Sequence, residues 1–232
     1  MLEHRNPKAE IARMREAITL DFVSDVVCPW CAIGLCGLLE AIQRVEGEID
    51  VELQIKPFEL NADMPAEGED LVEHLQRKYG SSAEDIASNH KRIRDFGEEV
   101  GFHFDLHKRQ RIYNTFDAHR LLHWAAEQGR DLALKQALLH AYFGEGRNIS
   151  DSEELLDLAT SVGLDPVRTR EILDSDAYAS EVIEEEEFFT SHGIRAVPAV
   201  IINGRQLISG AQSADYYEKA LRQVAEKSEP VP

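Results

Sequence analysis

Two cysteines separated by two residues are the side chains of this sequence best suited to covalent chemistry. Cys28 and Cys31 enclose Pro29 and Trp30 in a Cys-Pro-Trp-Cys run, a spacing that lets the two sulfurs close into a disulfide and open again. Pro29 fits the first position of a helix, where its missing N–H costs nothing. Cys28 would then lie at the positive end of that helix, which favours a thiolate. We therefore expect a lowered pKa for the Cys28 thiol.

The helix after the pair gives the two sulfurs different roles. At about 100° per residue, Cys31 falls on the apolar stripe that contains Leu35 and Leu38, so we expect it to face inward and Cys28 to be exposed. Exposed Cys28 would attack a disulfide, and buried Cys31 would release the product from the mixed disulfide. Cys36 lies about 140° around the helix from Cys31 and cannot bridge to it. We expect Cys36 to pack as a small apolar residue, and an intermolecular disulfide is the alternative.

Two other interpretations of the pair stay open. A structural zinc site takes about four ligands, usually from two such pairs, and the sequence holds no second Cys-x-x-Cys. A zinc site completed by two distant histidines, or a pair without any chemical role, would still fit the residues. A redox role requires the pair to follow a strand and precede a helix. The elements around the pair meet that requirement.

These elements form a strand–helix–strand unit. Residues 19–23 alternate apolar and polar side chains and predict a strand, and residues 29–45 carry apolar residues at helical spacing. Residues 51–58 alternate again and predict a second strand. Such a unit places the cysteines where the first strand passes into the helix.

A long block of helical periodicity, with capping and stop signals, separates this unit from the last strands. Strand character returns at residues 199–203, and Asn203-Gly204 predicts a hairpin. The predicted class is therefore α/β, a small strand-containing domain interrupted by a large all-helical insertion. We assign residues 17–63 and 193–228 to the first domain and residues 64–192 to the insertion. We expect its acidic run, residues 184–187, to be a solvated helix face.

Charge and hydropathy exclude two classes of partner. The chain has 25 basic and 43 acidic residues and a net charge of −18, which repels phosphate backbones and anionic lipid headgroups. The longest uncharged run, residues 26–39, is shorter than the about 20 residues of a spanning helix. We expect no nucleic acid partner and no membrane association.

The cysteine count and the first residues indicate a compartment. Three cysteines in 232 residues are too few for a disulfide-stabilised secreted scaffold. Residues 1–16 carry charges of both signs and lack the apolar segment of a signal peptide. We expect a cytoplasmic protein whose fold depends on its hydrophobic core.

Five segments together resemble the DsbA-like branch of the thioredoxin superfamily. They are Asp21–Cys31, Pro57–Asn61, Asn114–His119, Gly193–Pro198 and Ile208–Gln212. Within that branch the chain is most similar to the FrnE-like subgroup, which is related to 2-hydroxychromene-2-carboxylate isomerases and kappa-class glutathione transferases. The resemblance spans about residues 19 to 226 and implies a thioredoxin fold.

The resemblance also implies roles for residues outside the cysteine motif. Pro198 would be in cis beside Cys28 and belong to the catalytic site, and Val197 would offer its backbone to a substrate polypeptide as an added strand pairs. A trans proline at the start of a strand would fit the sequence equally well. Within the motif, we expect Trp30 to be an exposed apolar platform beside the sulfur that contacts the substrate together with Pro29, and a buried core role is the alternative for Trp30.

The resemblance further implies that Asn114 and His119 lie on a helix facing the active-site groove and bind substrate. A surface position is the alternative for His119. His119 and His123 are four residues apart, a spacing that would suit a metal ion, but no His-Glu-x-x-His pattern accompanies them. We expect no metal site.

The function expected from these residues is a thiol-disulfide oxidoreductase acting on a disulfide-containing protein or a small thiol. The related isomerases and transferases carry serine where this chain has Cys28, and the cysteine favours dithiol exchange. A glutathione-dependent isomerase or transferase acting on a small aromatic molecule is the alternative, and a non-catalytic peptide-binding module is a further one. Exchange needs no cofactor, with glutathione open as a co-substrate and a homodimer open as the assembly.

Overall fold

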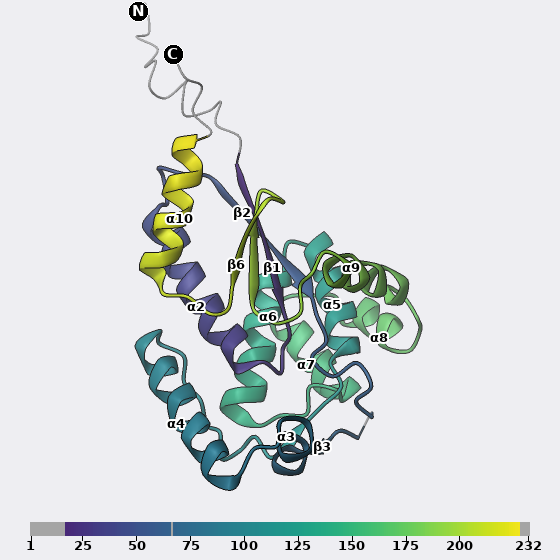
Figure 1. The fold of residues 1–232 in the computed structure, drawn as a ribbon. Helices are drawn as coiled ribbons and strands as arrows, with labels where there is room; N and C mark the ends of the chain where they lie inside the picture. The colour runs from purple at the N-terminus through teal and green to yellow at the C-terminus, as the bar shows by residue number, and fades with distance from the viewer. Residues whose placement is uncertain (1–16, 66, 228–232) are drawn as a thin grey trace, which may run out of the picture.

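The structure is a computed structural model that describes residues 17–65 and 67–227. Residues 1–16, from which the cytoplasmic location was expected, lie outside the described residues, and so does the predicted domain boundary at residue 228. Figure 1 shows the fold. Along the chain the elements are β1 (Ile18–Ser24), α2 (Pro29–Arg44), β2 (Val51–Pro57), β3 (Glu69–Asp70), α3 (Leu71–Tyr79), α4 (Ala83–Glu99), β4 (Arg111–Ile112), α5 (Phe116–Glu127), α6 (Asp131–His140), a π-helical turn η1 (Ala141–Glu145), α7 (Ser152–Ser161), α8 (Pro166–Leu173), α9 (Ala179–Ser191), β5 (Ala199–Ile202), β6 (Gln206–Ser209) and α10 (Ala214–Lys227).

A four-stranded sheet with the order β2-β1-β5-β6 forms the centre of the molecule. β1 pairs with β2 in parallel and with β5 antiparallel, and β5 pairs with β6 antiparallel. β1 is an inner strand because Leu20 and Phe22 are fully buried and both of its edges are paired. Helices α2 and α10 lie on one side of the sheet, and α5, α6 and α9 lie on the other (Figure 1). The predicted α/β thioredoxin fold with a helical insertion is confirmed.

The insertion between β2 and β5 is mainly helical, but it also holds a small antiparallel sheet. Glu69 pairs with Ile112, and Asp70 pairs with Arg111. The expectation of an all-helical insertion is corrected in this detail. Strands of two residues are too short to produce the alternation by which a strand is predicted.

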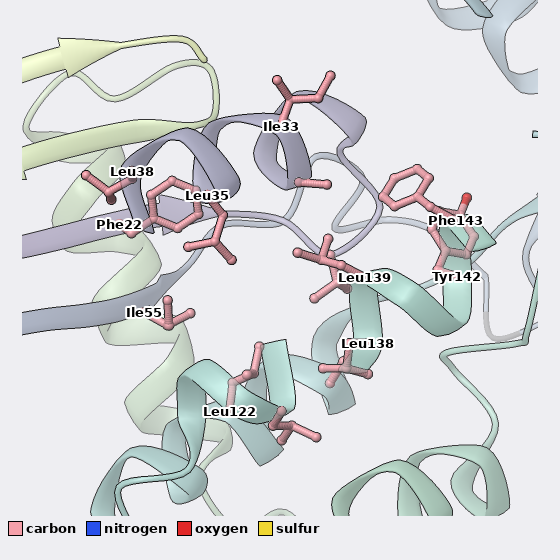
Figure 2. Packing of buried hydrophobic residues seen from close by; sticks show 14 of the residues in the cluster. Phe22, Ile33, Leu35, Leu38, Ile55, Leu122, Leu138, Leu139, Tyr142 and Phe143 are labelled. Atoms are coloured by element: carbon pink, nitrogen blue, oxygen red, sulfur yellow. The ribbon is translucent and has the colours of Figure 1, made fainter. Parts of the chain in front are cut away.

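One hydrophobic cluster joins the sheet to the inserted helices. It includes Phe22 of β1, Leu35 of α2 and Ile55 of β2 together with Leu122 of α5 and Leu138 of α6. Figure 2 shows these side chains in one continuous core. The insertion therefore covers an apolar face of the sheet, while its separation from the rest as a domain of its own stays a prediction. Among residues 17–65 and 67–227, no helix is long and apolar enough to cross a membrane.

Candidate active site

The Cys28–Cys31 pair lies at the junction of β1 and α2. Cys28 is the residue that caps α2, with an extended backbone (φ −91°, ψ 113°), and Pro29 is the first helical residue, as the sequence predicts. The N–H groups of Cys31 and Ala32 donate to the Cys28 carbonyl oxygen at 3.1 and 3.4 Å. Cys28 is therefore the residue at the positive end of the helix.

The pKa values of the two thiols are displaced in opposite directions. The hydrogen bond from the Cys31 thiol lowers the pKa of Cys28, and the N–H groups of Cys31 and Trp30 add to this effect against burial and the negative charge of Asp25. Burial raises the pKa of Cys31 well above its usual range, and its interaction with Cys28 raises it further. A reduced pair that loses one proton therefore holds the negative charge on Cys28.

Both sulfurs are shielded from solvent, which corrects the expectation that Cys28 is exposed. Cys28 is 4% exposed and Cys31 is 0% exposed. Helix α4 packs against the first turn of α2, which holds the pair. The Trp30 ring meets the edge of Phe96 with ring centres 5.6 Å apart, and the guanidinium of Arg92 lies 5.7 Å from the Trp30 ring centre.

A cavity of about 420 Å³ reaches Cys28 from the side of the inserted helices. Pro29, Trp30 and Val197 share its lining with Cys28, and α3 and α4 supply much of the opposite wall. The volume lies within the range of about 300–1,000 Å³ typical of small-molecule sites. Three of the expected substrate-binding residues are thus brought together around the sulfur.

Pro198 follows a cis peptide bond after Val197, as the resemblance implied. The Cys28 thiol donates to the Val197 carbonyl oxygen, with 3.7 Å between sulfur and oxygen. Helix α2 approaches Pro198 closely because position 34 is glycine: a Cβ there would lie 3.0 Å from the Pro198 ring. The loop before β5 and the beginning of α2 therefore form one compact site.

Asn114 and His119 lie elsewhere, since neither belongs to the lining of this cavity. The Asn114 side chain donates to the Met64 carbonyl oxygen at 3.0 Å and accepts from the Phe116 N–H at 2.9 Å, so it fixes the beginning of α5. His119 is 1% exposed and is not a surface residue. Their predicted contact with substrate stays a prediction.

Two buried charged residues beside the cysteines were not singled out from the sequence. Asp25 and Lys135 are both 0% exposed. The Asp25 carboxylate accepts the Leu60 N–H at 2.7 Å, and His119 Nε2 lies 3.5 Å from Asp25 Oδ1, too far for a good hydrogen bond. The Lys135 ammonium donates to the Ser24 carbonyl oxygen at 3.4 Å.

The environment moves the pKa values of these charges. Burial works against the charged form of Asp25, but its contacts with His119 and the Leu60 N–H outweigh burial, and the pKa of Asp25 is lowered. Burial lowers the pKa of Lys135, opposed by the negative charges of Cys31 and Asp25. The charges also act on the thiols: Asp25 raises the pKa of Cys28, and Lys135 lowers that of Cys31.

Both residues carry a signal in the sequence that could have identified them. Lys135 lies three and four residues before Leu138 and Leu139 and interrupts the apolar stripe of α6. Asp25 directly precedes the longest uncharged run of the chain. A charge inside an apolar pattern indicates a buried ionised group with a partner.

The two spaced histidines do not converge on a common site. His123 Nδ1 lies 3.5 Å from Glu185 Oε2, whereas His119 faces Asp25. Within the described part of the chain, no group of three or more His, Cys, Asp or Glu side chains is placed to hold a metal ion.

Known proteins share this fold. Residues 19–222 match the DSBA-like thioredoxin domain family. The "Uncharacterized protein YwbO" of Bacillus subtilis is 29% identical over 199 residues, which cover 85% of this chain and 92% of that protein. The crystal structure of "probable DsbA oxidoreductase SCO1869" from Streptomyces coelicolor is 30% identical, with a TM-score of 0.86 and 93% of each chain covered.

A 2-hydroxychromene-2-carboxylate isomerase is similar in fold alone, at 15% identity, with a TM-score of 0.68 and coverage of 90% of this chain and 97% of the isomerase. The family match extends over nearly the whole described chain and includes Cys28, Cys31 and Pro198. The chain therefore belongs to the DSBA-like thioredoxin domain family.

Proposed function

We propose that this protein is a thiol-disulfide oxidoreductase in which Cys28 is the nucleophile and Cys31 the resolving thiol. The observation that carries the proposal is the placement of Cys28 at the beginning of α2, next to the thiol of Cys31 and on the wall of a cavity. This placement supports a thiolate at the sulfur that substrate can reach and a protonated thiol at the sulfur that it cannot.

The exchange proceeds in two displacement steps. The Cys28 thiolate attacks one sulfur of a substrate disulfide, the substrate S–S bond breaks, and the departing thiolate takes up a proton. Cys31 then loses its proton and attacks Cys28 Sγ, which releases the second half of the substrate as a thiol. The substrate gains two electrons and two protons, and the protein is left with a Cys28–Cys31 disulfide. The reverse sequence oxidises a dithiol substrate.

Substrates of this exchange are a disulfide-containing protein or a small disulfide or thiol, and we place the reaction in the cytoplasm. Pro29, Trp30 and Val197 are proposed to contact the substrate because they line the cavity beside Cys28. Pro198 is proposed to contribute by holding the Val197 carbonyl oxygen against the Cys28 thiol. No cofactor takes part in these steps.

Reduction of insulin and of bis(2-hydroxyethyl) disulfide by the wild-type protein tests the proposal. Cys28→Ser is expected to abolish turnover because it removes the nucleophile. Cys31→Ser is expected to accumulate a mixed disulfide with substrate, visible by mass spectrometry. Cys36→Ser is the matched control and is expected to keep wild-type turnover, since Cys36 lies on another face of α2. Turnover that survives Cys28→Ser would refute the assignment of the nucleophile.

A second candidate, a glutathione-dependent isomerase or transferase, is favoured by the cavity, whose volume suits a small aromatic molecule. Conversion of a hydroxychromene carboxylate in the presence of glutathione, unchanged by Cys28→Ser, would support it over dithiol exchange. In that case glutathione would be a co-substrate and Cys28 would not form a covalent intermediate.

A further inference from the structure

Arg109 is a buried cation on the wall of the same cavity as Cys28. Its side chain is only 6% exposed, and Nε and Nη1 are buried without a hydrogen-bond partner among the described residues. The guanidinium lies 5.6 Å from the ring centre of Tyr142 and 5.2 Å from that of Phe143. The aromatic rings support the cation, but they do not accept the hydrogen bonds that its N–H groups can donate in plane.

The surroundings of Arg109 leave its N–H groups available to a ligand. Asp85 is the carboxylate in the cavity lining, and it accepts from the Ser82 N–H and hydroxyl at 2.9 and 2.8 Å. His74 also lines the cavity and is paired with Glu69 at 2.7 Å. Buried N–H donors without a partner are rare in folded proteins, because each has lost its hydrogen bond to water without gaining another acceptor, which costs free energy.

A second unpartnered donor or acceptor lines the cavity from α4. His90 Nε2 is buried and has no hydrogen-bond partner among the described residues. Burial lowers the pKa of His90, and the nearby charge of Arg109 lowers it further. A neutral imidazole and a guanidinium therefore share the wall of the cavity that also contains Cys28.

We propose that this cavity binds a low-molecular-weight disulfide bearing a carboxylate, with the carboxylate on Arg109, a further polar contact to His90, and the S–S bond at Cys28. The proposal rests on the proposed function and names its substrate class. A guanidinium matches a carboxylate because two parallel N–H groups meet two oxygens. The net charge of −18 disfavours anions over the surface as a whole, so an anionic substrate needs a local cation of this kind.

The volume and shielding of the site favour a small molecule over a folded protein. The space of about 420 Å³ suits a ligand of small-molecule size, and Cys28 on its wall is only 4% exposed. The reaction is the exchange described above: the Cys28–Cys31 dithiol is oxidised to a disulfide, and one substrate disulfide becomes two carboxylate-bearing thiols.

Three disulfides of similar length and different charge test the proposal: dithiodipropionate (anionic), bis(2-hydroxyethyl) disulfide (neutral) and cystamine (cationic). Prereduced protein is mixed with each, and the rate of its single-turnover oxidation is followed by tryptophan fluorescence. Each rate constant is divided by the rate constant for the reaction of dithiothreitol with the same disulfide, which corrects for differences in the intrinsic reactivity of the three disulfides. The wild-type protein is expected to prefer the anionic disulfide over the neutral and the cationic one.

Arg109→Gln is expected to reduce the preference for the anionic over the neutral disulfide by about tenfold to a hundredfold, the size of a charge-assisted hydrogen bond. Arg109→Lys keeps the positive charge but loses the two parallel N–H groups of the guanidinium, and it is expected to retain part of the preference for the anionic disulfide. Lys108→Gln, the matched control, removes the same charge from a 57% exposed side chain that pairs with Asp105, and wild-type preference is expected. Succinate, which has no disulfide, is expected to compete with dithiodipropionate in the wild type.

The outcomes separate this proposal from the one it rests on. Failure of the wild type to reduce even the neutral disulfide would refute the oxidoreductase function. Normal reduction of the neutral disulfide, without an anionic preference or competition by succinate, would refute the carboxylate site alone. Equal losses for all three disulfides in Arg109→Gln would show that Arg109 only supports the fold. A loss of insulin reduction alone in Arg109→Gln would indicate instead that Arg109 binds an acidic side chain of a protein substrate.

Discussion

Asp25 and Lys135 surround the two sulfurs with opposite charges that are fully buried. Their effect on the thiols is unequal, because Asp25 acts against a thiolate at Cys28 and Lys135 favours one at Cys31. The beginning of α2 and the Cys31 thiol must therefore overcome Asp25 to lower the pKa of Cys28. The charges of Asp25 and Lys135 therefore influence which of the two sulfurs holds the proton.

Asp25→Asn is expected to lower the pKa of Cys28 further, because it removes the negative charge that opposes the thiolate. The same change is expected to cost about 1–3 kcal/mol of unfolding free energy, since it weakens buried polar contacts. Ultraviolet titration of the thiolate and urea unfolding measure the two effects. Asp63→Asn removes an equal charge at an exposed position and serves as the control. A Cys28 pKa that rises or stays constant in Asp25→Asn would contradict the expectation.

Helix α9 illustrates how acidic residues position a whole element. The expectation of a solvated acidic face at residues 184–187 is wrong for its central pair. Glu185 accepts from the ammonium of Lys56 in β2 at 2.8 Å and lies 3.5 Å from His123 Nδ1 in α5. These contacts link α9 to both elements. Glu186 is partly buried, and its Oε1 has no hydrogen-bond partner among the described residues.

Glu59, just after β2, carries a similar unpartnered oxygen. Burial and the charge of Glu186 raise the pKa of Glu59 to about 8, and burial and the charge of Asp25 raise the pKa of Glu186 to about 7. Near neutral pH, the folded protein therefore keeps a proton on Glu59 at this contact between α9 and the segment after β2.

This contact predicts that the protein loses stability as the pH rises from about 4.5 to about 8. The sign follows because the folded state keeps protons on carboxyl groups that the unfolded chain has already released. Glu59→Gln is expected to raise the unfolding free energy near pH 8 by about 1 kcal/mol, a value that is reduced because Glu59 is partly exposed. Near pH 4.5 the unfolding free energy is expected to stay unchanged. Urea unfolding at both ends checks it.

Glu184→Gln, on the exposed side of α9, is the control for that experiment and is expected to leave the pH dependence intact. The same pH dependence in Glu59→Gln as in the wild type would show that Glu59 is not the group responsible.

The whole molecule is organised around the cluster that joins the sheet to α5 and α6. Leu138 is 0% exposed within it, so Leu138→Ala is expected to cost about 2–5 kcal/mol. Because the cluster is continuous, the loss is expected to appear in both parts of the molecule at once. Val167→Ala, at a 67% exposed position, is expected to change stability by less than about 0.5 kcal/mol.

The two tryptophans allow this coupling to be measured, because Trp30 lies on α2 and Trp124 on α5. Trp30→Phe and Trp124→Phe each leave one reporter. Coincident urea transitions in the two variants, shifted equally by Leu138→Ala, are expected for one cooperative unit. Separate transitions would show instead that the predicted division at residues 64 and 192 marks independently folding domains.

The local elements of the site could be predicted from neighbouring residues. Strand alternation before Cys28, Pro29 at the first helical position and Asn203-Gly204 between two short strands act over a few residues, so they are legible along the chain. The cis peptide at Pro198 and the thioredoxin fold were expected from the resemblance of several segments together. The two-residue strands of the insertion carried no such pattern.

The sequence by itself determined the chemistry available to this protein: a cysteine pair where a strand passes into a helix, at the positive helix end that favours a thiolate. Only the tertiary structure decided how that chemistry is enclosed. Residue 25 lies three positions before the pair, whereas residues 109 and 135 are distant along the chain. Residue 135 reaches the surroundings of the pair because α6 packs against the sheet, and residue 109 reaches the cavity wall beside Tyr142 and Phe143. Burial and the electric field at a sulfur depend on these distant neighbours, which no local pattern specifies.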